Sequence, residues 1–124
     1  MTQAVGMDCV EIARIEASWK EHGERFLQRI FLPAEIQYVL SHANPAIPLA
    51  ARFAAKEAVS KALGTGIGQQ VNWLDIEVVR QESGKPEVVL HGGALALMKK
   101  MGAGKILLSL THTRDLAMAT AILV

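Results

Sequence analysis

Alternation of apolar and polar residues along the chain predicts several strands. Residues 73–80, WLDIEVVR, alternate apolar with charged side chains, which is typical of a half-buried strand. The turn sequence ESGKP follows it, so the next apolar run is expected to return as the second strand of a hairpin. The remaining short apolar runs also have strand character. The expected strands are therefore at 3–8, 73–80, 86–91, 105–112 and 116–124.

Other stretches repeat their apolar residues at helical spacing. Ile12, Ile15 and Trp19 recur in this way, and Gly23 is a natural end for that helix. Pro33 suits the first position of a later helix, because its missing N–H has no intrahelical partner there. The expected helices are at 10–23, 24–31, 33–42, 48–63 and 92–102, with ANPAIP at 43–48 as a breaker segment.

Helices and hairpins are interleaved with little βαβ regularity, so the fold is expected to be α+β with a mostly antiparallel sheet. The length of 124 residues favours a single domain, residues 1–124. Apolar residues make up 51% of the chain, which excludes a disordered protein and weakly favours an oligomer.

The charge balance limits the kinds of partner. The formal net charge of +1 gives no support to bulk binding of nucleic acid or membrane. The lone Cys9 permits no internal disulfide, and neither a signal peptide nor an apolar run of membrane-spanning length is expected. A cytoplasmic location is therefore expected.

The segment RFAAKEAVSKALGTGIG, residues 52–68, carries charges on two sides of an alanine-rich helix. At about 100° of rotation per residue, Arg52 and Lys56 lie on one side, and Glu57 and Lys61 on another. An ordinary surface pair between Glu57 and Lys61 is one interpretation, worth a few tenths of a kcal/mol. Because alanine dominates the helix, we favour external partners instead: a metal for Glu57 and an anion for the three basic residues.

Asp8 is a second candidate metal ligand, placed at the end of the first expected strand. Taken alone, it reads better as the N-cap of the next helix. The four histidines are scattered and the cysteine is single, which argues against a zinc site. Two carboxylates without soft ligands suit Mg²⁺, which completes its shell with water and phosphate.

Two further segments have both a structural and a functional interpretation. Residues 64–68, GTGIG, follow a helix and fail the spacing of the phosphate-binding fingerprints, so a helix terminus is favoured, although backbone amides there could help to hold an anion. His112 ends a strand beside hydroxyl residues, where it is either a structural residue or a donor to phosphate. No nucleophile elbow surrounds Ser109, so a serine hydrolase is not indicated.

Arg25 and Arg29 are four residues apart on a short helix, and like charges at that spacing repel. With Arg14 and Phe26 they form either a solvated face or a docking surface for an acidic partner.

Several stretches together resemble the holo-acyl-carrier-protein synthase family of 4′-phosphopantetheinyl transferases. VGMDCVEIARI resembles the family's N-terminal signature, and RFAAKEAVSKALGTGIG closely resembles its central signature. WLDIEV, GKP and SLTHT follow in the family's order, so the resemblance spans nearly the whole chain. It implies transfer of phosphopantetheine from coenzyme A to a serine of apo acyl carrier protein, for fatty acid biosynthesis, with release of adenosine 3′,5′-bisphosphate.

The resemblance also implies roles for particular residues. Asp8 and Glu57 would hold Mg²⁺ against the pyrophosphate, and Lys61 would neutralise the phosphates. A homotrimer is implied, with sites shared between chains and acyl carrier protein docked on the arginine surface. The implied nucleotide contacts are Arg52, Lys61, Gly66, Lys85, Pro86, His112 and Thr113.

The general base is left open between Glu57 and a water held near Glu35, where some relatives have aspartate. Two alternatives remain: a non-catalytic anion- or RNA-binding domain, which the near-neutral charge and few aromatics disfavour, and an inactive relative. Retention of Asp8, Glu57 and Lys61 argues against the inactive relative.

Overall fold

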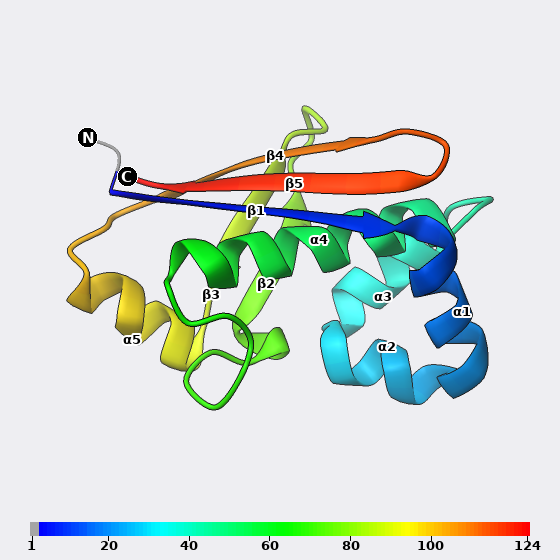
Figure 1. Cartoon of the computed structure of the whole chain (residues 1–124), viewed down its shortest axis with the longest axis horizontal. Helices are drawn as coiled ribbons and strands as arrows, with labels where there is room; N and C mark the ends of the chain where they lie inside the picture. The colour runs from blue at the N-terminus through cyan, green and yellow to red at the C-terminus, as the bar shows by residue number, and fades with distance from the viewer. Residues whose placement is uncertain (1–2) are drawn as a thin grey trace.

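A three-stranded antiparallel sheet forms one layer of the molecule, and one long helix lies along its inner face (Figure 1). The computed structural model describes residues 3–124. The sheet has the order β1-β5-β4 and the long helix is α4. Their bounds are β1 Ala4–Glu11, β5 Leu116–Leu123, β4 Ile106–His112 and α4 Ala46–Ala62.

Small residues allow the sheet and the helix to approach closely. Every second residue of β5 faces inward, and three of these four are alanines. On β1, a Cβ atom at Gly6 would lie 2.0 Å from the backbone oxygen of Ala58 and 2.6 Å from the backbone nitrogen of Ala62. Any side chain at Gly6 would therefore push β1 away from α4, together with the residues that follow it.

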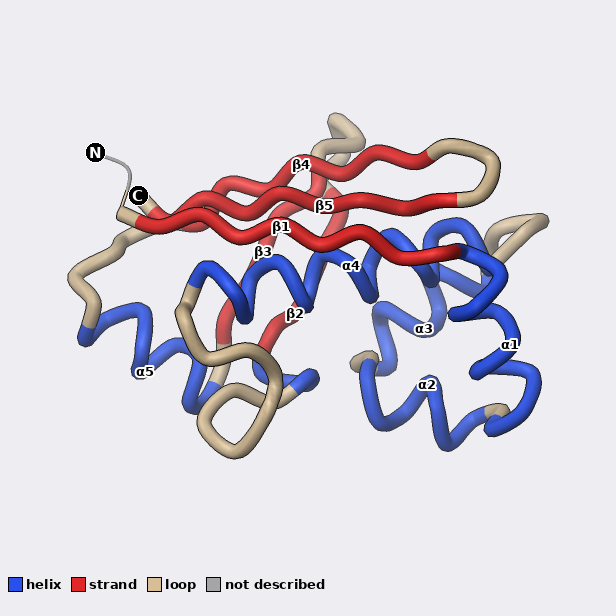
Figure 2. Tube along the Cα trace, in the orientation of Figure 1, coloured by secondary structure: helices blue, strands red, loops and turns tan. Residues whose placement is uncertain are grey.

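The remaining elements cover the two ends of α4 (Figure 2). At its N-terminal end lie three short helices, α1 Ile12–His22, α2 Glu24–Ile30 and α3 Pro33–Leu40. Toward its C-terminal end lie the 3₁₀ turn η1 Trp73–Asp75, the hairpin β2 Ile76–Arg80 with β3 Pro86–Leu90, and α5 Gly92–Lys100. Two hydrophobic clusters, one at each end of α4, form the core.

The α+β fold with antiparallel strands packed on helices is confirmed, and three boundaries are corrected. β1 continues three residues beyond Asp8, because Asp8 to Glu11 stay paired with β5. α4 begins at Ala46 rather than Pro48, since a proline in the first turn forfeits no intrahelical hydrogen bond. Residues 73–75 form η1 instead of strand, which leaves Leu74 38% exposed.

The hairpin β2–β3 forms a separate two-stranded sheet. Among the helices at residues 3–124, none combines the length and the apolar character needed to cross a membrane.

Candidate active site

Asp8 lies on the inward face of β1, two residues after Gly6, and therefore points toward α4. The ammonium group of Lys61 donates to Asp8 Oδ1 at 2.9 Å and to the backbone oxygen of Met7 at 3.1 Å. The other carboxylate oxygen, Asp8 Oδ2, is buried and has no hydrogen-bond partner within residues 3–124. Asp8 is not the helix N-cap considered from the sequence, because that position belongs to Glu11.

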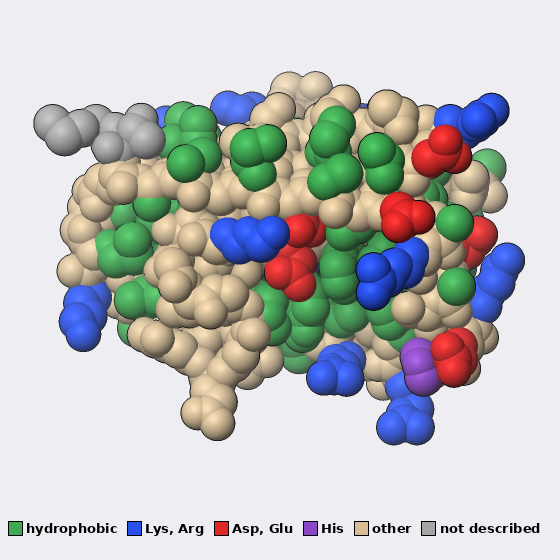
Figure 3. Space-filling view, viewed as in Figure 1, with side chains coloured by type: hydrophobic (Ala, Val, Ile, Leu, Met, Phe, Trp, Pro, Cys, Tyr) green, Lys and Arg blue, Asp and Glu red, His purple; other side chains and the backbone are tan. Residues whose placement is uncertain are grey.

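Glu57 brings a second carboxylate to the same place. Burial raises the pKa of Glu57, and the negative charge of Asp8 raises it further, while Lys61 acts in the opposite direction. Two carboxylates and one basic residue thus meet where β1 crosses α4, and charged side chains gather there in the centre of Figure 3.

The donor set fits a hard divalent cation. The unpartnered oxygen of Asp8 and the raised pKa of Glu57 both indicate that Lys61 compensates the two carboxylates only in part. No larger group of three or more His, Cys, Asp and Glu side chains suited to a metal occurs within residues 3–124. A cation with two carboxylate ligands and a shell completed by water and phosphate oxygens matches the preference of Mg²⁺.

An open hollow of about 400 Å³ adjoins these carboxylates and is lined by both of them and by Arg14, Phe26 and Phe53 among others. A second hollow of about 390 Å³ is lined by Arg25, Phe26, Arg29 and Trp73 among others. Phe26 borders both, so the four residues of the sequence-predicted docking surface surround two neighbouring hollows. The rings of Phe53 and Trp73 pack against each other with centroids 4.9 Å apart, and each ring lines one of the two hollows.

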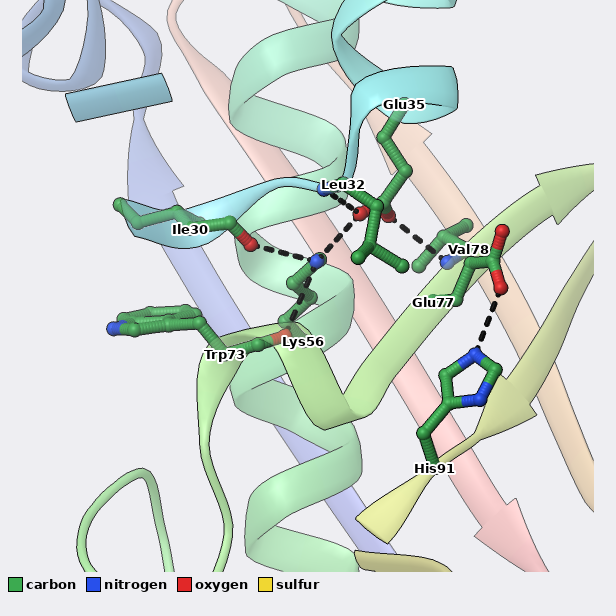
Figure 4. A network of polar contacts seen from close by, with 8 residues as sticks. All are labelled: Ile30, Leu32, Glu35, Lys56, Trp73, Glu77, Val78 and His91. Carbon is green, nitrogen blue, oxygen red and sulfur yellow. Dashed lines mark hydrogen bonds and ion pairs between the residues drawn. The ribbon is translucent and has the colours of Figure 1, made fainter. Parts of the chain in front are cut away.

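Lys56 has a different partner from the anion expected from the sequence (Figure 4). Its ammonium group is fully buried and donates to Glu35 Oε1 at 2.7 Å and to the backbone oxygens of Ile30 and Trp73. All three of its hydrogens are used within the core. Lys56 is therefore a structural residue in this chain and is not available to a ligand.

The carboxylate of Glu35 is likewise buried and bound within the core. Its side chain is 2% exposed, and besides Lys56 it accepts from the backbone amides of Leu32 at 2.8 Å and Val78 at 2.9 Å. Figure 4 shows that the pair joins α3, α4 and β2. Because this carboxylate is buried and already accepts from three donors, it is poorly placed to hold a water beside Glu57, which disfavours the water-mediated alternative for the general base.

Lys61 lies beside Asp8, but five of the other sequence-predicted nucleotide contacts, Arg52, Lys85, Pro86, His112 and Thr113, lie apart from Asp8 and Glu57. Arg52 and Pro86 line a third open hollow, of about 420 Å³, on another side of α4. Pro86 and Lys85 also line a hollow of about 250 Å³ between β3 and β4. His112 and Thr113 are exposed at the end of β4, two strands away from β1 in the sheet.

The loop after α4 has few free donors. The amides of Gly64, Thr65, Gly66 and Gly68 each donate to a backbone carbonyl. Gly64 and Gly66 have positive φ angles of 86° and 67°, as expected for a helix terminus. A nucleotide contact at Gly66 would thus depend on close approach of the backbone rather than on its amide.

Three aromatic residues and one arginine at these hollows were not predicted from the sequence. Phe53 and Trp73 read as ordinary core residues by their spacing, and only the fold brings them together beside Phe26. Tyr38 and Arg80 lie near the ends of a helix and a strand that the sequence shows as unconnected, and Tyr38 contacts both Arg80 and Arg52. The one sequence signal that could have identified this pair is a tyrosine on a polar helix face.

Comparison with known proteins gives consistent matches. The sequence profile of the 4′-phosphopantetheinyl transferase superfamily matches residues 4–121. A holo-[acyl-carrier-protein] synthase of Moorella thermoacetica is 49% identical, covering 94% of this chain and 90% of that protein. The crystal structure of the synthase from Neisseria meningitidis superposes with a TM-score of 0.92 at 32% identity, covering 100% of this chain and 99% of the other. The Helicobacter pylori synthase in complex with coenzyme A gives a TM-score of 0.86 at 32% identity, covering 97% and 99%.

Proposed function

The chain belongs to the 4′-phosphopantetheinyl transferase superfamily, and on that premise we propose that it is a holo-acyl-carrier-protein synthase. The proposed reaction transfers the 4′-phosphopantetheine group of coenzyme A to a serine of apo acyl carrier protein. We propose that it takes place in the cytoplasm and serves fatty acid biosynthesis. The observation that carries the proposal is the cluster of Asp8, Glu57 and Lys61 where β1 crosses α4. The structure of the Helicobacter pylori synthase in complex with coenzyme A supports coenzyme A as the source of the transferred group.

In the proposed mechanism, the serine oxygen attacks the phosphorus that bears the pantetheine, and the pyrophosphate bond breaks to release adenosine 3′,5′-bisphosphate. Asp8 Oδ2 and Glu57 would hold Mg²⁺, which supplies charge stabilisation to the phosphoryl oxygens when bound. Lys61, fixed by Asp8, is placed to neutralise a phosphate. A base must also take the serine proton, and the candidates are Glu57 itself and a water held at the metal site.

Mass spectrometry tests the proposal directly. Apo acyl carrier protein incubated with the chain, coenzyme A and Mg²⁺ should gain the mass of one phosphopantetheinyl group. The same mixture with EDTA in place of Mg²⁺ is the control and should show no gain. A carrier protein that stays in the apo form with Mg²⁺ present would contradict the proposed function.

Docking of the carrier protein is proposed at Arg14, Arg25, Phe26 and Arg29, around two neighbouring hollows, one of which Glu57 lines. The expected partner surface is acidic, so these arginines would steer and hold it. Arg14→Glu should raise KM for the carrier protein about tenfold and leave KM for coenzyme A within about twofold. Lys99→Glu on α5 makes the same charge change away from the surface and should leave both constants unchanged. An equal effect of Arg14→Glu on both substrates would place Arg14 in the nucleotide site.

A homotrimer with shared sites is also proposed. The outward residues of β1 and β4 include Val5, Met7 and Leu107, which are 60%, 64% and 37% exposed, and hydrophobic side chains line the upper edge of Figure 3. Such a surface favours association with another chain. Because the metal cluster lies apart from Arg52, Lys85, Pro86, His112 and Thr113 in one chain, these nucleotide contacts would come from a neighbour.

Mixing two damaged chains tests the shared site. Glu57→Gln would damage the metal side of each interface and His112→Ala the nucleotide side, so each variant alone should be poorly active. After co-refolding in equal amounts, about a quarter of the interfaces would carry both intact sides, and roughly a quarter of the activity should return. Native mass spectrometry should show mixed trimers. Mixed trimers with no more activity than the better single variant would rule out a shared site.

A further inference from the structure

The hollow beside Arg52 contains two guanidinium groups arranged around one tyrosine. Arg52 lies over the ring of Tyr38 with its central carbon 3.9 Å from the ring centroid. Arg80, at the end of β2, donates to Tyr38 Oη at 3.2 Å, and its central carbon is 5.9 Å from the same ring. All three line the 420 Å³ hollow together with Pro86 and Ser109.

The positive charge in this hollow is not balanced by the described part of the chain. Neither Arg52 nor Arg80 pairs with a carboxylate within residues 3–124. Arg52 is only 5% exposed, and its buried Nε has no hydrogen-bond partner there. Burial lowers the pKa of Arg52, and Tyr38 and, more weakly, Glu35 oppose this effect. The oxygens of Glu35 are already bound by Lys56 and two amides.

A buried guanidinium without a counter-charge is costly unless a ligand supplies the charge. Guanidinium forks match the geometry of phosphate oxygens, and two of them around one hollow suit a group with two negative charges. Backbone geometry favours the placement of Arg80, because Gly84 has a φ of +89° and a Cβ there would lie 3.3 Å from Arg80 Nη2. The turn therefore leaves room for Arg80 to fold over the tyrosine.

We infer that Tyr38 and Arg80 determine specificity for a terminal phosphate monoester, with Arg80 binding it beside Arg52 and Tyr38 positioning both arginines. The inference rests on the proposed function, under which the monoester is the 3′-phosphate of coenzyme A. Arg80 is the residue that contacts this phosphate, and Tyr38 acts through the two arginines that it orients.

Comparison of coenzyme A with 3′-dephospho-coenzyme A tests the inference. The wild-type chain should prefer coenzyme A, and Arg80→Gln should reduce the ratio of the two kcat/KM values about tenfold, the loss of one charge-assisted phosphate contact. The kcat/KM for 3′-dephospho-coenzyme A should not change. Tyr38→Phe keeps the ring and removes the hydroxyl that holds Arg80, so its ratio should fall less. Lys100→Gln on α5 removes a positive charge elsewhere and should keep the wild-type ratio.

Calorimetry gives a readout that does not depend on catalysis. Adenosine 3′,5′-bisphosphate should bind the wild-type chain more tightly than adenosine 5′-monophosphate, and Arg80→Gln should remove most of that difference. Inorganic phosphate should compete only weakly, and equally strong binding of free phosphate would overturn the assignment to a nucleotide. An unchanged ratio in Arg80→Gln, with transfer from coenzyme A intact in the wild-type chain, would overturn the inference alone. Absence of transfer by the wild-type chain would instead overturn the proposed function.

Discussion

Glu35→Gln is expected to destabilise the fold by about 3–5 kcal/mol, the usual cost of leaving one partner of a buried ion pair alone. The change keeps the size of the side chain but leaves the fully buried ammonium group of Lys56 without its counter-charge. Urea unfolding followed by circular dichroism measures the loss, and Glu82→Gln in the exposed hairpin turn is the matched control. Lys56→Met in the Glu35→Gln background should recover part of the stability, because the buried charge is then removed.

The pH dependence of that variant follows from Lys56. Burial lowers the pKa of Lys56, and the attraction of Glu35 opposes this effect. Without Glu35 the pKa falls further, so the unfolded chain binds the proton that the folded chain releases. Stability of Glu35→Gln should therefore rise with pH between the lowered folded pKa and the ordinary value for lysine.

Activity separates this structural role from catalysis. Per folded molecule, Glu35→Gln should lose far less transfer activity than Glu57→Gln. A stable Glu35→Gln variant with a large loss of kcat would show that Glu35 serves the reaction directly.

Glu57→Gln is expected to reduce transfer by about 10²- to 10³-fold with the fold intact, the scale seen when one electrostatic contact to a transition state is removed. The amide keeps the size of the side chain and removes the charge that would attract Mg²⁺. Because Glu57 is partly exposed, the free energy of unfolding should change little. Transfer rates measured over a Mg²⁺ titration should show a higher Mg²⁺ requirement.

A binding measurement complements the rates. Mg²⁺ should raise the thermal unfolding temperature of the wild-type chain in the presence of adenosine 3′,5′-bisphosphate, and Glu57→Gln should lose that rise. In the wild-type chain, Mg²⁺ affinity should fall as the pH drops through the raised pKa of Glu57, because the cation must displace the proton. Glu16→Gln on α1 is the matched control. Wild-type turnover of Glu57→Gln at limiting Mg²⁺ would refute the metal assignment.

Local patterns were sufficient to predict most of the fold. Period-two alternation and helical spacing located the hairpin, the C-terminal strands and the helices, and Gly23 and Pro33 marked boundaries through their own backbone restrictions. The end of β1 was missed because it depends on a distant partner. β1 extends past Asp8 because β5 continues to pair with it, and no local signal in β1 reports the length of β5.

The site was predictable only where charges share an element. Glu57 and Lys61 stand one turn apart on α4, so their proximity follows from helix geometry, and Asp8 was joined to them through the family signature. Lys56 could not be assigned in this way. Its partner Glu35 lies 21 residues earlier on another helix, and the sequence does not show that this carboxylate is buried. Tyr38 and Arg80 were missed for the same reason, since 42 residues separate them.

The alternation along β1 has a consequence for how the protein can change over evolution. Gly6, Asp8 and Val10 face the helix, whereas Val5, Met7 and Cys9 face outward, so one strand encodes two surfaces in interleaved positions. Substitutions can alter either surface independently. A single-residue insertion or deletion ahead of Asp8 alters both surfaces at once, because a slip of one position exchanges the two sets and carries the carboxylate to the opposite face. The strand should therefore tolerate changes of composition on its outward side while its length between Gly6 and Glu11 stays fixed.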